Sequence, residues 1–263
     1  MIRYVALGSS FAAGPGIEPI LEPGCARSGR NYPHLVAGRL GCDLVDVTSG
    51  GATIDDLLTR PQALLIGGTV PPQVEAVGPD TDLVTVTVGG NDVEYLLTLL
   101  RCSYRADPDG APLPSRAFFA TPIDRAAVHA ALAVLPDRLA ELVGEVRRRA
   151  PRARVVLVDY LTAVPERATA AFPMSEQHHV LCADVGRRLE AATAAAAHDT
   201  GADLVAASAA SREHAVGSAE PWVTGWVFGD LLGGGVVPYH PNAAGMRAVA
   251  DLLVEQLSAD RAG

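Results

Sequence analysis

The sequence contains no lysine, so its 21 basic residues are all arginines. They are outnumbered by 30 acidic residues, which gives a formal net charge of −9. Nucleic acids and anionic membranes present negative phosphates and bind proteins through clustered cations. The charge balance therefore argues against a nucleic-acid partner and against an anionic membrane surface.

Long apolar runs are missing as well. No stretch approaches the roughly 20 consecutive apolar residues that a membrane-spanning helix needs. No charged and then apolar leader precedes the first predicted strand, which begins at Ile2. We expect a soluble protein without an integral membrane segment, and secretion stays open for a chain from which a leader has been removed.

Cysteines are few and widely spaced, at Cys25, Cys42, Cys102 and Cys182. Without a CxxC pair, the spacing predicts neither a zinc site nor a thioredoxin motif, and no other pattern predicts a cofactor. A disulfide between Cys25 and Cys42 is compatible with the sequence. Cys102 and Cys182 fit buried apolar thiols equally well, and together these features favour a reduced, cytoplasmic protein.

What the sequence does contain is an alternation of strand and helix patterns. Short apolar runs predict strands at 2–7, 44–47, 82–88, 154–159 and 202–206. Helices are predicted at 32–40, 54–58, 93–101, 132–149, 176–198 and 246–257, with long loops at 11–30, 102–121, 160–175 and 208–239. This alternation predicts one α/β domain over residues 1–263, with three α/β/α layers around a five-stranded parallel sheet.

Three of the predicted strands end in polar turns that contain glycine. Ser10 follows the first strand, Gly51 the second and Asn91 the third. The carboxyl ends of parallel strands meet at one edge of a sheet, where open α/β folds bind their ligands. Acyl transfer needs a nucleophile and preorganised donors for the oxyanion. We therefore interpret Ser10 as the nucleophile, with the backbone N–H groups of Ser10 and Gly51 and the amide of Asn91 as donors.

A base for this nucleophile is available at the start of the last predicted helix. His240 is the one histidine placed at a plausible sheet edge, because the other six fall in loops and helices. His178 and His179 lie one turn before Cys182, but we find no further residue to complete a metal site with them. His240 is therefore the predicted base, and no metal is predicted.

Four short blocks occur in order along the chain. They read Gly8-Ser9-Ser10, Ser49-Gly50-Gly51-Ala52-Thr53, Gly89-Gly90-Asn91-Asp92 and Val237-Pro238-Tyr239-His240-Pro241. In these blocks the sequence resembles the SGNH, or GDSL-type, hydrolases, and the residues of its motifs are similar to those of actinobacterial esterases and lipases. The resemblance implies a flavodoxin-like fold, a Ser10 nucleophile, a His240 base and an oxyanion hole at Ser10, Gly51 and Asn91.

Two positions depart from the pattern of that family. Ser9 stands where the family usually has an aspartate, and Val237 stands where it has the acid of a catalytic triad. Some actinobacterial relatives use a Ser–His dyad, in which a backbone carbonyl orients the imidazole. By resemblance, the carbonyl of Val237 takes that role here, and Asp230, the nearest upstream acid, is its rival.

The function predicted from these residues is that of a serine ester hydrolase acting on a small-molecule or lipid-like ester. An acyltransferase with the same site chemistry is the first alternative. The second is a catalytically weak binding protein that keeps the fold, since Ser9 and Val237 are altered. A nucleotide-binding protein is not indicated, because no GxGxxG follows the first strand and no P-loop lysine exists. The oligomeric state is not predicted.

Overall fold

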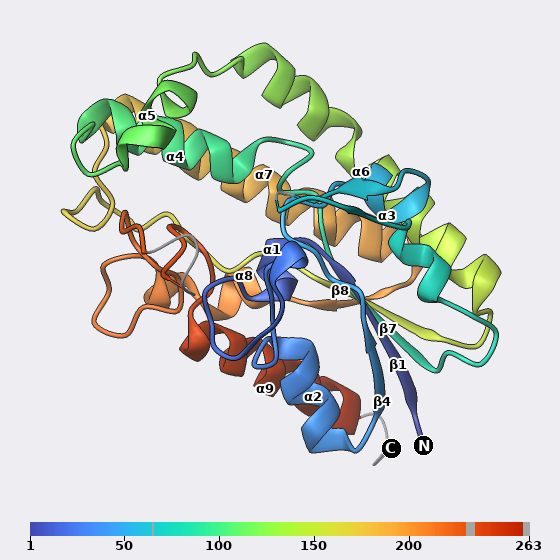
Figure 1. Ribbon diagram of the computed structural model, residues 1–263. Helices are drawn as coiled ribbons and strands as arrows, with labels where there is room; N and C mark the ends of the chain where they lie inside the picture. The colour runs from blue at the N-terminus through green and yellow to red at the C-terminus, as the bar shows by residue number, and fades with distance from the viewer. Residues whose placement is uncertain (65, 230–234, 260–263) are drawn as a thin grey trace.

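The central sheet of the protein has five parallel strands in the order β4-β1-β7-β8-β9 (Figure 1). This computed structural model describes residues 1–64, 66–229 and 235–259. The strands are β1 Arg3–Gly8, β4 Asp43–Asp46, β7 Leu83–Thr87, β8 Arg154–Val158 and β9 Asp203–Val205. The chain places its first strand beside its second and third, so the direction of winding reverses at β1. Open sheets bind ligands at such a reversal.

The three inner strands, β1, β7 and β8, are buried because helices cover both faces of the sheet. All residues of β7 are buried, and its neighbours on either side pair with it in parallel register, with Val84 opposite Val5 of β1 and Val155 of β8. A strand without a solvent-facing side reads as a continuous apolar, β-branched run instead of an alternating one. This is the reason that the strands were recognisable in the sequence.

Helices form a layer on each side of the sheet (Figure 1). Helices α2 and α9 pack together on one face, while α3, α4, α6 and α7 pack on the other. Their bounds are α2 Tyr32–Leu40, α3 Ile54–Leu58, α4 Tyr95–Ala106, α6 Arg125–Arg149, α7 Glu176–Thr200 and α9 Ala243–Ala259. The predicted three-layer α/β/α architecture is confirmed.

Side-chain caps explain where several helices begin. Asn31 accepts a hydrogen bond from the His34 N–H and starts α2 at the predicted residue. Helix α6 starts seven residues before its predicted beginning, because Asp124 accepts from the Ala127 N–H and caps an additional first stretch. The apolar stripe that predicted this helix therefore located its packed part only.

Parts of the predicted loops are ordered into short elements. The segment after β1 contains α1 Ser10–Ala13 and the hairpin of β2 Ile20–Glu22 and β3 Arg27–Ser28. The segment after α4 contains α5 Leu113–Phe119. The remaining short elements are β5 Gln62–Ala63, β6 Thr69–Val70 and α8 Ala207–Ala210, with 3-10 helices at Pro23–Cys25, Gln73–Ala76 and Arg212–His214. Elements this short lack the apolar period that reveals a helix or strand in a sequence.

The cysteines carry thiols and not disulfides. The bridge between Cys25 and Cys42 that the sequence allowed does not form, whereas Cys102 and Cys182 are buried, as the alternative interpretation held. None of the helices in the described ranges is both long enough and apolar enough to cross a bilayer.

Candidate active site

The turn that carries Ser10 is a direct continuation of the sheet. Strand β1 ends at Gly8, and the Ser9 N–H still donates to the Thr87 carbonyl at the end of β7, 2.9 Å away. The side chain of Gln73 accepts from the Gly8 N–H at 2.7 Å and donates to the Gly8 carbonyl at 3.0 Å. Ser10 lies at the carboxyl edge of the sheet, as predicted, and it begins the short helix α1, which was not predicted.

Ser10 and His240 are brought into hydrogen-bond contact although 230 residues separate them. The distance from His240 Nε2 to Ser10 Oγ is 2.9 Å, and the distance from His240 Nδ1 to the Pro238 carbonyl oxygen is also 2.9 Å. A carbonyl oxygen only accepts hydrogen bonds, so Nδ1 carries the proton of the neutral ring. Nε2 is then free to accept the proton of the Ser10 hydroxyl.

Burial keeps this imidazole neutral. His240 is 3% exposed, and its ring lies 5.4 Å from the ring of Phe11, between centroids. Burial lowers the pKa of His240 to about 4, and the hydrogen bond to the Pro238 carbonyl opposes that shift. A charged imidazolium would lose its hydration here, so the unprotonated, basic form is the stable one near neutral pH.

Thr224 makes hydrogen bonds to the turn that contains His240 through both its main chain and its side chain. Thr224 donates its N–H to the His240 carbonyl at 2.9 Å, and its carbonyl accepts from the Tyr239 N–H at 3.2 Å. Its hydroxyl accepts from the His240 N–H at 3.1 Å and donates to the Val237 carbonyl at 2.5 Å. Tyr239 itself has a left-handed backbone with φ 59, which is strained for a residue with a side chain.

The carbonyl beside His240 Nδ1 therefore belongs to Pro238 and not to Val237. The Thr224 hydroxyl donates to the Val237 carbonyl. The left-handed backbone of Tyr239 bends the chain, so that the Pro238 carbonyl faces the imidazole. The placement that resemblance implied was wrong by one residue. Asp230, the rival, lies outside the described residues.

The three predicted oxyanion donors lie on adjacent turns. The Ser49 N–H donates to the Gly8 carbonyl at 3.0 Å, which joins the Gly51 turn to the Ser10 turn. Asn91 Nδ2 donates to the Ala52 carbonyl at 2.8 Å and so joins the third turn to the second. Gly51 has φ 79, a conformation that favours glycine. Within the described part of the chain, the N–H groups of Ser10 and Gly51 have no hydrogen-bond acceptor.

Asp92 bonds the first residue of a helix that comes earlier in the chain. Its carboxylate accepts from the Ile54 N–H, 3.1 Å from Oδ1, at the start of α3. Burial is the main cause that raises its pKa. The residue next to Asn91 thus ties the β7 turn to the helix after the Gly51 turn.

Tyr160 is a site residue that the sequence interpretation missed. Its hydroxyl oxygen accepts from the Gly90 N–H at 2.9 Å and lies 3.1 Å from Ser9 Oγ. Burial raises the pKa of Tyr160 to about 12, so the phenol keeps its proton, and either hydroxyl can donate in its hydrogen bond with Ser9. A Cβ at Gly90 would lie 2.7 Å from the Tyr160 ring, which requires glycine there. The signal was present, because Tyr160 follows a strand end just as Ser10 does.

The other histidines considered are placed away from this contact. His179 Nε2 bonds the Pro165 carbonyl at 2.7 Å, and its ring lies against Phe172. Burial lowers the pKa of His178. Among the residues that the structure describes, no group of three His, Cys, Asp or Glu side chains is arranged to hold a metal ion.

A family model described as the GDSL-like lipase/acylhydrolase family matches residues 6–248 of this chain. The chain belongs to this family. It is accordingly a hydrolase of the lipase and esterase class, and the resemblance inferred from the four sequence blocks is confirmed.

Relatives of known name agree with the family assignment. The chain is 34% identical to Lipase 2 of Streptomyces coelicolor over 98% of this chain and 87% of the relative. The solved structure of an extracellular lipase from Streptomyces rimosus superposes with a TM-score of 0.73 and 25% identity, covering 97% and 99% of the two chains. A phospholipase A1 from Streptomyces albidoflavus gives a TM-score of 0.72 and 25% identity over 96% and 97%. These comparisons do not support the cytoplasmic location that the cysteine pattern favoured.

Proposed function

We propose that this protein hydrolyses carboxylic esters through a Ser10 nucleophile activated by His240. The observation that carries the proposal is the hydrogen-bonded series from Ser10 Oγ through the imidazole to the Pro238 carbonyl. Membership of the GDSL-like lipase/acylhydrolase family supports the same reaction. A nucleophile, a base within hydrogen-bond reach and a group that orients the base are the parts that acyl transfer requires.

In the first half of the reaction, Ser10 Oγ attacks the carbonyl carbon of the ester while its proton passes to His240 Nε2. The bond from that carbon to the alcohol oxygen then breaks, and the alcohol leaves with the proton from Nε2. In the second half, water attacks the acyl–Ser10 ester and gives a proton to Nε2. The acid leaves as the Ser10–carbon bond breaks, and the proton returns to Ser10 Oγ.

The oxyanion of each tetrahedral intermediate needs donors that are already in place. We assign this role to the N–H groups of Ser10 and Gly51 and to the amide of Asn91. The unoccupied backbone donors and the hydrogen bond that orients the Asn91 amide toward the Gly51 turn support the assignment.

The proposed catalytic unit is a Ser–His dyad. The Pro238 carbonyl fixes the tautomer of His240, which is the task of the acid in a triad. We further propose that residues 1–263 form one domain, supported by a single contiguous cluster of buried apolar residues. The extracellular lipase of Streptomyces rimosus supports action outside the cell.

Labelling with a fluorophosphonate, which reacts with activated serines, tests the nucleophile. The wild-type protein is expected to be labelled and to hydrolyse p-nitrophenyl acetate, whereas Ser10→Ala loses both properties. Ser9→Ala is the matched control, because it removes the neighbouring hydroxyl, and it is expected to keep the label. Labelling that survives in Ser10→Ala would overturn the assignment. Acyl transfer to an added alcohol in preference to water would identify an acyltransferase with the same site.

A further inference from the structure

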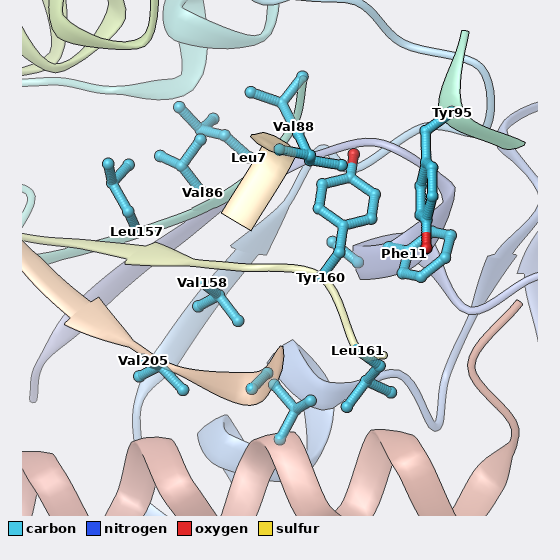
Figure 2. Close-up of a cluster of buried hydrophobic side chains, with 14 of the residues drawn as sticks. Leu7, Phe11, Val86, Val88, Tyr95, Leu157, Val158, Tyr160, Leu161 and Val205 are labelled. Carbon is cyan, nitrogen blue, oxygen red and sulfur yellow. The ribbon is translucent and has the colours of Figure 1, made fainter. Parts of the chain in front are cut away.

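A small cavity lies directly beside the nucleophile. Ser10 and Asn91 line its polar side, and Phe11, Tyr95, Leu96 and Tyr160 line its apolar side. Figure 2 shows the rings of Phe11 and Tyr95 next to the ring of Tyr160. We call this space the Ser10 cavity.

The Ser10 cavity lies on the side of the site that the acyl group must take. The carbon of a tetrahedral intermediate bears the Ser10 oxygen, the oxyanion, the leaving alcohol oxygen and the acyl chain. The oxyanion faces the donors, and the leaving oxygen faces His240, which supplies its proton. His240 does not line the cavity. Asn91 borders the cavity on its polar side, where the oxyanion is held, so we assign the apolar side of the cavity to the acyl chain.

The Ser10 cavity has room for very little. Its volume is about 10 Å³. This is close to the space for one water molecule, and hence for one methyl group. An acetyl group fits in this direction, whereas each further methylene must displace a wall.

The walls of the Ser10 cavity are fixed by contacts behind them. Tyr160 is held by its hydrogen bonds to Gly90 and Ser9. Its ring packs 4.5 Å from Phe11 and edge-on, 6.3 Å, from Tyr95, measured between centroids. Tyr95 is buried, and a Cβ at Gly186 of α7 would lie 3.1 Å from its hydroxyl oxygen. Hydrogen bonds and ring contacts, and not a lack of space behind them, therefore hold the two tyrosines in place.

A much larger hollow lies behind the same two tyrosines. Its volume is about 460 Å³. Its lining includes Tyr95 and Tyr160, together with Leu161, Val164 and Val180. The two rings thus separate the Ser10 cavity from a space that has room for a longer chain. The rings of Tyr95 and Tyr160 therefore limit the length of the acyl chain that fits beside Ser10, although the protein has a larger space behind them.

From this geometry we infer that the substrates are esters of very short acids, above all acetyl esters, and that Tyr95 and Leu96 set this limit. The inference deepens the proposed ester hydrolysis and rests on it. It differs from the long-chain specificity that the word lipase suggests, and it leaves the alcohol part of the substrate unrestricted.

The test compares kcat/KM for the p-nitrophenyl esters of acetate, butyrate and hexanoate, all used as monomers without detergent. The wild-type protein is expected to favour acetate over hexanoate by about 100-fold, because methylenes that exceed a rigid pocket are strongly rejected. A wild-type protein that cleaves hexanoate as well as acetate overturns the inference. Absence of turnover on all three esters, together with absence of fluorophosphonate labelling, overturns the proposed function instead.

Two variants test whether these walls are the cause. Leu96→Ala widens the cavity at a half-buried position of α4, and Tyr95→Ala joins the cavity to the larger hollow. Either is expected to raise the hexanoate-to-acetate ratio by about 10-fold. Leu100→Ala is the matched control, because it is equally half-buried one turn further along α4 but does not line the cavity. If Tyr95→Ala fails to fold, Leu96→Ala decides alone. A ratio unchanged from that of Leu100→Ala would show that the walls do not set the limit.

Discussion

Ser10 and His240 are in contact, but the protein positions them by different means. Ser10 follows β1 after one residue, and the sheet hydrogen bonding continues through Ser9 to the end of β7. His240 comes after a long connection from β9 to α9, and its turn is held by Thr224 and contains the strained Tyr239. The nucleophile is thus part of the sheet, whereas the base is held by loop contacts.

The turn that carries Ser10 has more independent supports than the turn that carries His240. The nucleophile turn has main-chain bonds to a buried sheet, the Gln73 side chain and the Tyr160 hydroxyl. The histidine turn takes all four of the contacts described above from the main chain and side chain of Thr224, and it gains one more from the Tyr239 hydroxyl, which is hydrogen-bonded to Ser103 Oγ. Loss of a single side chain is therefore expected to harm the base more than the nucleophile.

Among the substitutions that test the supports of the two turns, Thr224→Val is expected to lower kcat the most. It keeps the shape of the side chain and removes its hydroxyl. The Val237 carbonyl and the His240 N–H lose their partner, so we expect kcat to fall by about 10-fold, equivalent to about 1.4 kcal/mol, with KM little changed. The kinetics of p-nitrophenyl acetate hydrolysis measure this. Asp230→Asn is the control within the same segment and, for a dyad, is expected to change kcat by less than about 2-fold. A larger loss in Asp230→Asn would contradict the dyad.

A smaller effect on kcat, about 3-fold, is expected from Tyr160→Phe, because the sheet still holds the nucleophile turn. The variant leaves the buried Gly90 N–H without its acceptor, and the free energy of unfolding is expected to fall by about 1–3 kcal/mol. Urea denaturation and the kinetics of acetate ester hydrolysis separate the two effects. Ser9→Ala loses the other bond of Tyr160 and leaves Gly90 paired, so it is expected to destabilise the protein less. A loss of kcat greater than that of Thr224→Val would refute the comparison.

The smallest effect at neutral pH concerns protonation of the base. His240 must be unprotonated to act, so kcat/KM is expected to fall as the pH falls through its pKa. Since burial lowers that pKa to about 4 from the usual 6.5, the acid limb is expected near pH 4, and activity between pH 5 and 7 is expected to be nearly constant. A pH profile with p-nitrophenyl acetate measures the limb, and circular dichroism at each pH checks that the protein is folded. A midpoint near 6.5 would show that the imidazole is not buried as described.

Much of the fold was predictable because the strands are covered on both faces. The β7 run, buried throughout, stands out from any loop, and helices α2 and α3 have the bounds that their patterns indicated. Elements α1 and α5 were not predicted, since a helix of one or two turns has no measurable period. The start of α6 was placed too late, because Asp124 and its cap lie outside the apolar stripe.

The fold class, the family and the residue types at the site could be predicted from the sequence, because strand periodicity and the spacing of four short blocks are local properties of the chain. Three features required the folded structure: which carbonyl contacts the imidazole, that Tyr160 supports Ser9 where the family usually has an aspartate, and how little room lies beside Ser10. Each of these depends on side chains that are distant in sequence and on backbone angles such as that of Tyr239, which no local pattern records.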